Sequence, residues 1–320
     1  MITRKNYLLH IYDVLFGYEY IKNVKKPDLT MPDSVGTKRI SDILEILNAV
    51  EKKYLFNMQQ MFKLNVCKFS LWQQCMCDAF DIRTVFAASE FVAFCCLVDK
   101  FLDSKRFSDG FKDEIASGFL HISEIKHLGE KSGKYLDELR ALWNIFVEDV
   151  YSVPYLENQI NMITEYLSAA FVSEEHLCHS KLQEKETFIA DETELLTDKS
   201  TKFVTASFLI SDISGSYLDR IEIFDIIGQL FCIVDDICDL IEDVENRRKN
   251  SLLFTLPDQG RELVLSERVE MTVSRIDTAV CEAKTLIQLL NDDLSVEMFD
   301  FIMWEVHEWG YPIRKELGKE

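Results

Sequence analysis

The chain has 320 residues, 48% of them hydrophobic, which is enough to bury a large core in one big domain or two ordinary ones. Its formal net charge is −20, from 55 acidic against 35 basic residues, and this balance argues against nucleic acid and anionic membranes as partners. The nine cysteines are an odd number, set mostly in apolar runs, and indicate thiols in a reducing cytoplasm.

The N-terminal segment has a basic start and an apolar run that His10, Asp13 and Glu19 interrupt. Neither a signal peptide nor a membrane span fits this pattern, so we expect a cytoplasmic protein without membrane insertion. Residues 26–36 are the most polar and most interrupted stretch of the chain. We therefore expect residues 1–37 to form a first helix or a loosely attached arm.

Later in the chain, apolar residues recur at steps of three and four, as in Ile43, Leu47 and Val50, which is typical of amphipathic helices. Only five prolines occur, so helix breakers are rare. Short break signals lie at residues 26–36, 104–110, 129–133, 151–154, 212–219, 247–260 and 290–294. The sequence thus predicts an all-α fold of about ten to twelve helices in one domain over residues 38–320.

A first pair of carboxylates lies on the predicted hydrophobic helix 91–103, which carries Asp99 and Asp103 at i and i+4. By itself this spacing is weak evidence, because such a pair arises readily by chance near a helix end. The pair becomes evidence for a functional site only in combination with a second acidic helix.

That second helix spans residues 231–243, where Asp235, Asp239 and Asp243 follow one another at steps of four and form one stripe. Carboxylates so placed repel one another unless a cation lies between them, and hard oxygen ligands suit Mg²⁺. The alternative is an ordinary amphipathic helix with an acidic polar face. We favour the metal interpretation, because no Lys or Arg balances the stripe before Arg247.

The two carboxylate helices together predict a metal cluster that is presented to a diphosphate, above an apolar cavity for a hydrocarbon tail. Arg248 and Lys249 follow the second helix and form a candidate anion clamp, although a basic run at a helix end is also an ordinary charge preference.

At these motifs the chain resembles the class I isoprenoid synthases, the family of trans-isoprenyl diphosphate synthases and terpene synthases. Residues 227–239 are similar to the helix of the family's second DDxxD motif, with Cys232 where elongating members usually have glutamine. Residues 249–253 are similar to the GK(S/T)T segment that follows it, and residues 199–203 to the KTxxL segment whose lysine contacts diphosphate. The resemblance is clearest over residues 199–256.

The family's first motif maps onto residues 99–103, with Lys100 in place of the second aspartate. The GGKRxRP signature, with which elongating members bind a second diphosphate substrate, is only partly matched by residues 36–40. Where those members carry an RR pair after the first motif, this chain has Lys105 and Arg106, closer than expected. The features for a second substrate are therefore eroded, whereas those for ionising one substrate persist.

The resemblance implies a helical bundle of the isoprenoid synthase type around a central apolar cavity, with three Mg²⁺ ions bound together with diphosphate. It assigns catalysis to Asp99, Asp103, Asp235 and Asp239; metal binding to these four with Asp236 and Asp243; and substrate binding to Lys199, Arg248, Lys249, Phe91, Phe94 and Phe231. The three phenylalanines are explained equally well as plain core residues.

The function that the resemblance implies is a Mg²⁺-dependent terpene synthase, a carbon–oxygen lyase that ionises a linear prenyl diphosphate to a cyclic or acyclic terpene. One alternative is a prenyltransferase that condenses isopentenyl diphosphate with an allylic diphosphate. A second is a non-catalytic partner subunit of such an enzyme, suggested by Lys100. A third is a helical scaffold without ligand. The resemblance also implies a homodimer.

Overall fold

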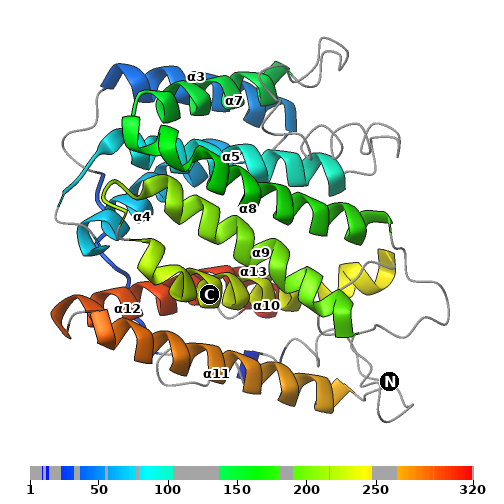
Figure 1. Ribbon diagram of the computed structural model, residues 1–320. Helices are drawn as coiled ribbons and strands as arrows, with labels where there is room; N and C mark the ends of the chain where they lie inside the picture. Colours follow the sequence, from blue (N-terminus) through cyan, green and yellow to red (C-terminus); the bar gives the residue numbers. More distant parts are fainter. Residues whose placement is uncertain are drawn as a thin grey trace. The chain divides into compact units, whose positions relative to one another are not determined.

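A computed structural model describes residues 9, 12–13, 23–31, 37–54, 57–76, 79–103, 137–179, 190–215, 217–246, 265–290 and 292–318. Within these residues the regular structure is entirely helical (Figure 1), which confirms the all-α prediction. The chain divides into two compact units. The first unit comprises residues 1–27, 172–204 and 222–320, and the second comprises residues 28–171 and 205–221. The isoprenoid synthase type and the boundary at residue 37 stay predictions.

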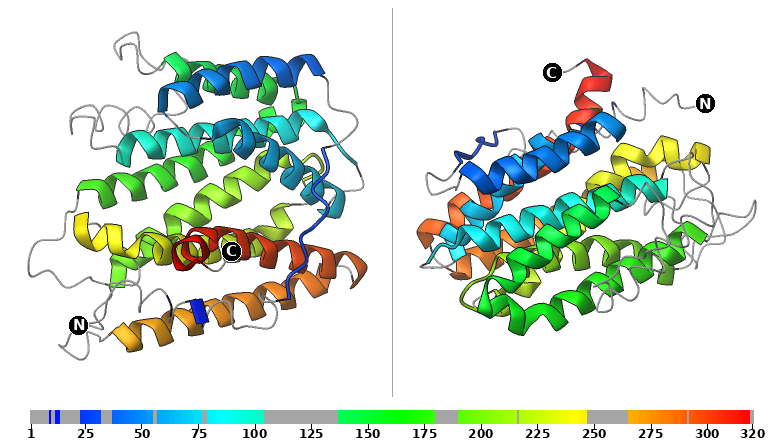
Figure 2. Two further views of the ribbon diagram at one scale, coloured as in Figure 1. Left: turned by 180° about the vertical axis from the view of Figure 1, so that it is seen from behind. Right: turned by 90° about the horizontal axis from the view of Figure 1, so that it is seen from above.

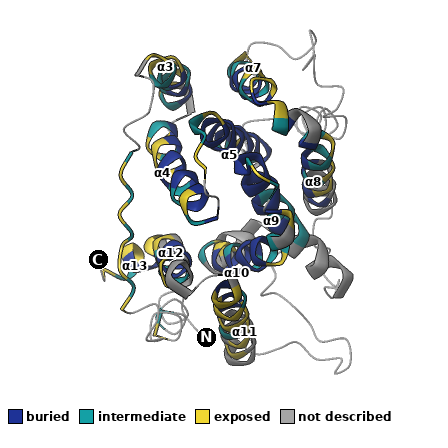
Figure 3. Cartoon of the chain, turned by 60° about the vertical axis from the view of Figure 1, so that its left-hand side comes forward, coloured by how far each residue is buried: buried dark blue, intermediate teal, exposed yellow. Residues whose placement is uncertain are grey.

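The second unit is built around one buried helix, α5. Its helices are α3 (Thr37–Tyr54), α4 (Met58–Met76), α5 (Ile82–Asp103) and α7 (Asp137–Tyr151), with parts of α8 (Pro154–His179) and α9 (Ala190–Ser211). Helix α5 packs against both α4 and α7, and α3 contacts the same two helices (Figure 2). Nearly the whole length of α5 is buried (Figure 3), as its apolar sequence requires.

Two helices of this unit begin where the sequence offers no glycine or proline. Asn57 caps α4 by accepting a hydrogen bond from the Gln60 backbone N–H at 3.3 Å, and Asp81 caps α5 by accepting one from the Arg83 N–H at 2.9 Å. We did not predict these two breaks. The predicted break at residues 151–154 is confirmed, because α7 ends at Tyr151 and Pro154 opens α8, where its missing N–H is not needed.

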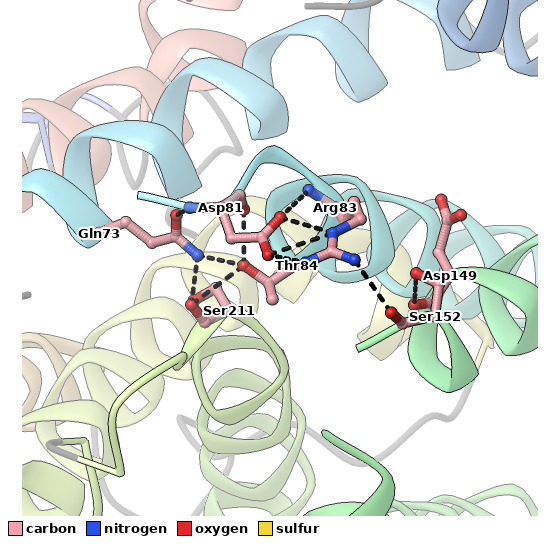
Figure 4. Close-up of polar contacts among 7 residues, drawn as sticks. All are labelled: Gln73, Asp81, Arg83, Thr84, Asp149, Ser152 and Ser211. Atoms are coloured by element: carbon pink, nitrogen blue, oxygen red, sulfur yellow. Dashed lines mark hydrogen bonds and ion pairs between the residues drawn. The ribbon is translucent and has the colours of Figure 1, made fainter. Parts of the chain in front are cut away.

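A polar framework links four helices of the second unit near their ends, and it is buried at Gln73 and exposed at Arg83 (Figure 4). The fully buried Gln73 of α4 donates to the Ser211 carbonyl at the end of α9, over 2.5 Å, and also to the Thr84 hydroxyl of α5. Its side-chain oxygen accepts from the Asp81 N–H at 3.1 Å. Arg83 donates to the Ser152 carbonyl beyond α7 at 3.0 Å. These bonds fix the helix ends relative to one another.

The turn after α9 is organised by Asp212, which is fully buried. One carboxylate oxygen accepts from the N–H groups of Ser214 and Gly215 at 3.0 Å, and the other from the Tyr217 N–H at 3.1 Å. Gly215 has φ +75°, and a Cβ there would come within 2.7 Å of the Tyr155 hydroxyl, so the turn requires glycine. The predicted break at residues 212–219 is confirmed, and a short 3₁₀ turn, η2 (Leu218–Arg220), leads into the next helix.

The first unit contains the start of α9, α10 (Ile221–Asn246), α11 (Leu265–Leu290), α12 (Asp292–Trp309) and α13 (Tyr311–Leu317). Helix α11 packs against α12, and α12 contacts α13. Among the described side chains of α11, the buried ones lie on one face and include Ala279, Ala283 and Ile287 at steps of four. Arg314 of α13 donates to the His307 carbonyl of α12. None of the helices in the described part of the chain has a stretch long and apolar enough to cross a membrane.

Candidate functional site

The predicted carboxylate stripe lies on α10, and its described members are exposed. Asp235 and Asp239 are both exposed, one helical turn apart, while Leu230, Ile233 and Val234 on the opposite side are buried. The acidic side chains therefore follow the amphipathic pattern of the helix. The backbone at Asp243 continues α10, but its side chain lies outside the described residues.

Asp236 differs from this exposed pair in being buried. It is only 9% exposed and accepts a hydrogen bond from the Cys232 thiol, with 3.8 Å between the sulfur and Oδ2. Residues next to each other on a helix point about 100° apart, so Asp236 does not share the direction of Asp235. Cys232 is thus the hydrogen-bond partner of Asp236.

Cys238 lies between the two exposed aspartates in sequence, and both of them affect the pKa of its thiol. Burial, and then the negative charges of Asp235 and Asp239, raise the pKa of the Cys238 thiol to about 12. The thiol therefore stays protonated near neutral pH, and a protonated thiol is a poor metal ligand. The donors that α10 offers at this point are oxygen atoms.

Helix α9 is held tightly against α10 by a close backbone contact. A Cβ on Gly228 would lie 2.5 Å from the Thr201 Cα and 2.9 Å from its backbone nitrogen, distances that real side chains do not reach. Only glycine permits this approach. The two helices run in opposite directions (Figure 1).

This contact sets where the predicted lysine segment lies. Lys199 is half-buried and lies two residues before Thr201, whereas Asp235 lies seven residues after Gly228. Because the helices are antiparallel, Lys199 is displaced from the contact toward Asp235. At about 1.5 Å per residue, the two Cα atoms are about 7 to 8 Å apart along the helix axes. Of the residues in the predicted stripe, Asp235 is therefore the one nearest to Lys199 along the helix axes, and Asp239 is one turn further away.

The first predicted motif lies at the end of α5 in the second unit. Asp99 is half-buried and Lys100 is exposed, while the side chain of Asp103 lies outside the described residues. Burial, followed by the nearby Cys96 and Asp99, raises the pKa of the Cys95 thiol, so Asp99 lies close to Cys95 one turn before it. Asp99 therefore shares the side of α5 on which the two cysteines lie.

Phe91 and Phe94 occupy a different side of α5. Both are fully buried; the Phe91 ring lies 5.6 Å from Phe146, and the Phe94 ring lies 5.0 Å from Trp143, between ring centroids. Trp143 and Phe146 are themselves neighbours on α7. On an ideal helix Phe94 points about 140° away from Asp99. These contacts explain both phenylalanines as core residues between α5 and α7, and their contact with a substrate tail stays a prediction.

Three further residues, Phe231, Arg248 and Lys249, were predicted to bind the substrate. Phe231 is half-buried on α10, and Arg248 and Lys249 lie outside the described residues. Within the described part of the chain, no group of three His, Cys, Asp or Glu side chains is close enough to hold a metal ion. The metal site, like the basic clamp, stays a prediction.

Sequence reasoning did not single out Arg39 as a structural residue. Its guanidinium donates to Asp149 Oδ1 at 2.7 Å and to the Ile145 carbonyl at 3.4 Å, both on α7. The partial match of residues 36–40 to the second-substrate signature of elongating enzymes thus includes an arginine that is committed to an ion pair within the fold. Sequence reasoning also missed Glu90, a fully buried carboxyl beside this pair, whose only signal was an acidic residue inside an apolar run.

Comparison with known proteins does not assign the chain to a family. No protein-family model matches the chain, and no curated protein matches it.

Proposed function

We propose that the chain is a Mg²⁺-dependent class I isoprenoid synthase, and more narrowly a terpene synthase that ionises a linear prenyl diphosphate. The observation that carries the proposal is on α10. Two carboxylates, Asp235 and Asp239, are exposed one turn apart on a helix that also has a buried apolar face, and the Gly228–Thr201 contact packs the segment of α9 that carries Lys199 against this helix. A metal-bound diphosphate needs carboxylates for the metal and a basic group for its own oxygens, and this combination of residues supports the proposal.

The donor set on α10 fits Mg²⁺. The ion prefers oxygen ligands, keeps several waters, and is commonly bound through one or two carboxylates together with substrate phosphates. Asp235 and Asp239 supply such a pair, and protonated Cys238 does not compete with them. Bound there, Mg²⁺ would neutralise the negative charge that develops on the departing diphosphate.

The chain's own residues would position and stabilise the substrate around this reaction. Lys199 would pair with a diphosphate oxygen, while Asp235 and Asp239 fix the orientation of the head group. The carbon–oxygen bond breaks with its electron pair remaining on diphosphate, which leaves an allylic cation. Loss of a proton from the cation gives a hydrocarbon, and addition of water followed by loss of a proton gives an alcohol. No oxidant or reductant is needed.

Arg39 favours ionisation of one substrate over condensation of two. In the elongating enzymes that the chain resembles, a basic N-terminal signature binds the second diphosphate. Here the Arg39 guanidinium is paired with Asp149 and bonded to the Ile145 carbonyl. A charge used in this way inside the fold is a poor anchor for a second, doubly charged head group.

One observation favours a second candidate, a non-catalytic partner subunit. Lys100 is exposed immediately after Asp99, where the resembling family has an aspartate. A lysine at this position replaces a negative charge with a positive one and weakens any cation binding by the first motif. Such a subunit would bind diphosphate weakly and would release none from its substrate.

The test is release of pyrophosphate by the purified full chain with Mg²⁺ and geranyl, farnesyl or geranylgeranyl diphosphate, each with and without isopentenyl diphosphate. Release from an allylic diphosphate alone, with a hydrocarbon or alcohol as product, is the expected result. Release that requires isopentenyl diphosphate and yields longer diphosphates would replace the proposal with the elongating enzyme. If every substrate stays intact while the chain is folded, the partner subunit replaces it.

A further inference from the structure

Glu90 is a carboxylic acid that the core of the second unit encloses completely. It lies in the middle of α5 with no solvent exposure, and neither carboxyl oxygen makes a hydrogen bond of ordinary geometry. An ionised carboxylate without partners in such a place costs several kcal/mol, on the order of the penalty for any unpaired buried charge. The enclosure therefore favours the protonated, neutral form of Glu90.

The charged groups that act on Glu90 come from two other helices. Asp149 of α7 and Arg39 of α3 act on it directly, and Glu148 of α7 acts more weakly. Arg39 and Asp149 are joined by the 2.7 Å bond, and Arg39 Nη1 is 3.7 Å from Glu148, whose side chain is 70% exposed. The Arg39 guanidinium thus acts on two carboxyls, the fully buried Glu90 and Asp149, whose side chain is 14% exposed, while Arg83 of α5 also acts on Asp149.

Among the described residues, neither the buried side chains of α4 nor the part of α9 in this unit brings a further charge to this place. The buried residues of α4 are uncharged apart from the thiol Cys67, and the part of α9 in this unit, residues 205–211, has no ionisable side chain. The guanidinium already bonds Asp149, so Asp149 is the carboxyl whose negative charge is compensated. Glu90 is left as the one that must hold a proton.

We propose that Arg39, Asp149 and Glu90 form a proton-dependent clasp between α3, α7 and α5, in which Glu90 carries the proton and Asp149 the charge. When Glu90 loses its proton, the partly exposed Arg39 guanidinium must compensate two carboxylates, one of them fully buried, and the favourable way to hydrate the extra charge is to loosen α3. The clasp makes docking of α3 sensitive to pH. It lies on the side of α5 opposite Asp99, about 180° around the helix, and so is separate from the proposed metal site.

The electrostatics of the pair agree with this assignment. Burial, and then Asp149, hold the pKa of Glu90 well above its usual 4.5, with Arg39 opposing the shift. Burial also raises the pKa of Asp149 above 3.8, although Arg39 and a loose hydrogen bond from Glu90 oppose this. A folded-state pKa above the unfolded value means that the folded chain binds the proton more tightly. The stabilisation is complete below the unfolded pKa and is lost as pH rises through the folded pKa.

Hydrogen exchange of the full chain, followed by mass spectrometry from pH 6 to pH 9 and corrected for the intrinsic pH dependence, tests the clasp. In the wild type we expect protection of α3 peptides to fall at least about tenfold over this range, while peptides of α12 in the other unit change little. Glu90→Gln, whose amide mimics a protonated carboxyl, should remove the fall. Glu148→Gln, a neighbouring exposed carboxyl, should keep it. An equal fall in wild type and Glu90→Gln, or no fall in the wild type, overturns the proposal.

A second measurement needs only the folded wild type, should Glu90→Gln not fold. Infrared spectroscopy distinguishes the carbonyl stretch of a protonated carboxyl from that of a carboxylate. We expect a protonated carboxyl at pH 7 that disappears as the pH is raised, in step with the loss of α3 protection. Absence of any protonated carboxyl in the folded wild type at pH 7 would overturn the proposal.

Discussion

Gly228 of α10 and Thr201 of α9 approach so closely that a Cβ on the glycine would lie 2.5 Å from the Thr201 Cα. Because the obstacle is backbone, it cannot rotate away as a flexible side chain would. The packing of the α9 segment that carries Lys199 against α10 depends on this contact.

Gly228→Ala should therefore destabilise the protein by about 1 to 3 kcal/mol, the usual effect of forcing extra atoms into a packed core. Helix propensity alone predicts the opposite sign, a gain of about 1 kcal/mol for alanine over glycine. Urea denaturation gives the sign directly. Gln229→Ala, a half-buried neighbour on the same helix, should change the free energy of unfolding by less than about 0.5 kcal/mol. A Gly228→Ala variant as stable as wild type would contradict the close approach.

The aromatic contacts of Phe94 make it a packing residue first. Phe94→Ala removes a fully buried ring that lies 5.0 Å from Trp143, and we expect a loss of about 3 to 5 kcal/mol in the free energy of unfolding. Phe231→Ala, at a half-buried position on α10, should destabilise the chain much less. Thermal denaturation of the two variants compares them. A larger loss for Phe231→Ala would show that the α5–α7 cluster is not the tighter core.

Much of the helical framework was predictable because its signals are local. The steps of three and four among Ile43, Leu47 and Val50 predict α3, and Pro154 marks the start of α8, as the structure confirms. The breaks before α4 and α5 were missed, because Asn57 and Asp81 act there as caps without glycine or proline. Capping residues are common in sequences, and only the side-chain bond to the backbone distinguishes a cap from a surface residue.

The site was predictable where it lies on one helix and not where it depends on contacts between helices. The exposure of Asp235 and Asp239 follows from their spacing, but the inward turn of Asp236 toward Cys232 depends on packing. The pairing of Arg39 with Asp149 joins residues 110 positions apart, and no sequence period encodes it. The same is true of Gly228, whose need for a small side chain comes from α9.

Arg39 should matter for stability and not for binding an allylic diphosphate. Arg39→Met leaves the Asp149 carboxylate half-enclosed without its partner, and we expect a loss of about 1 to 3 kcal/mol, less than for a fully buried pair because the guanidinium is partly exposed. Lys38→Met removes the same charge from an exposed neighbour and should be nearly neutral. Unfolding curves and the KM for the best allylic substrate separate the two roles. A KM raised tenfold in Arg39→Met, with stability unchanged, would assign Arg39 to substrate instead.

The raised pKa of Cys238 predicts that its thiol is alkylated slowly. With a pKa of about 12, on the order of one molecule in ten thousand carries the thiolate at pH 8, and the thiolate is the reactive form. Iodoacetamide at pH 8 should therefore modify the exposed Cys281 well before Cys238, as followed by peptide mass spectrometry. Asp235→Asn removes one of the charges that raise this pKa and should speed the modification of Cys238. Equal rates at Cys238 in wild type and variant would place Asp235 away from the thiol.

The most direct test of the proposed function is the effect of Asp235→Asn and Asp239→Asn on Mg²⁺-dependent pyrophosphate release from an allylic diphosphate. Asparagine keeps the size of the side chain and removes the charge, so folding should be preserved while metal binding is weakened. Asp225→Asn, a half-buried acid earlier on α10, is the matched control. We predict that each of the two variants loses at least about a hundredfold in kcat/KM while the control retains wild-type activity. Release that is unaffected by both substitutions would contradict a catalytic metal site on α10.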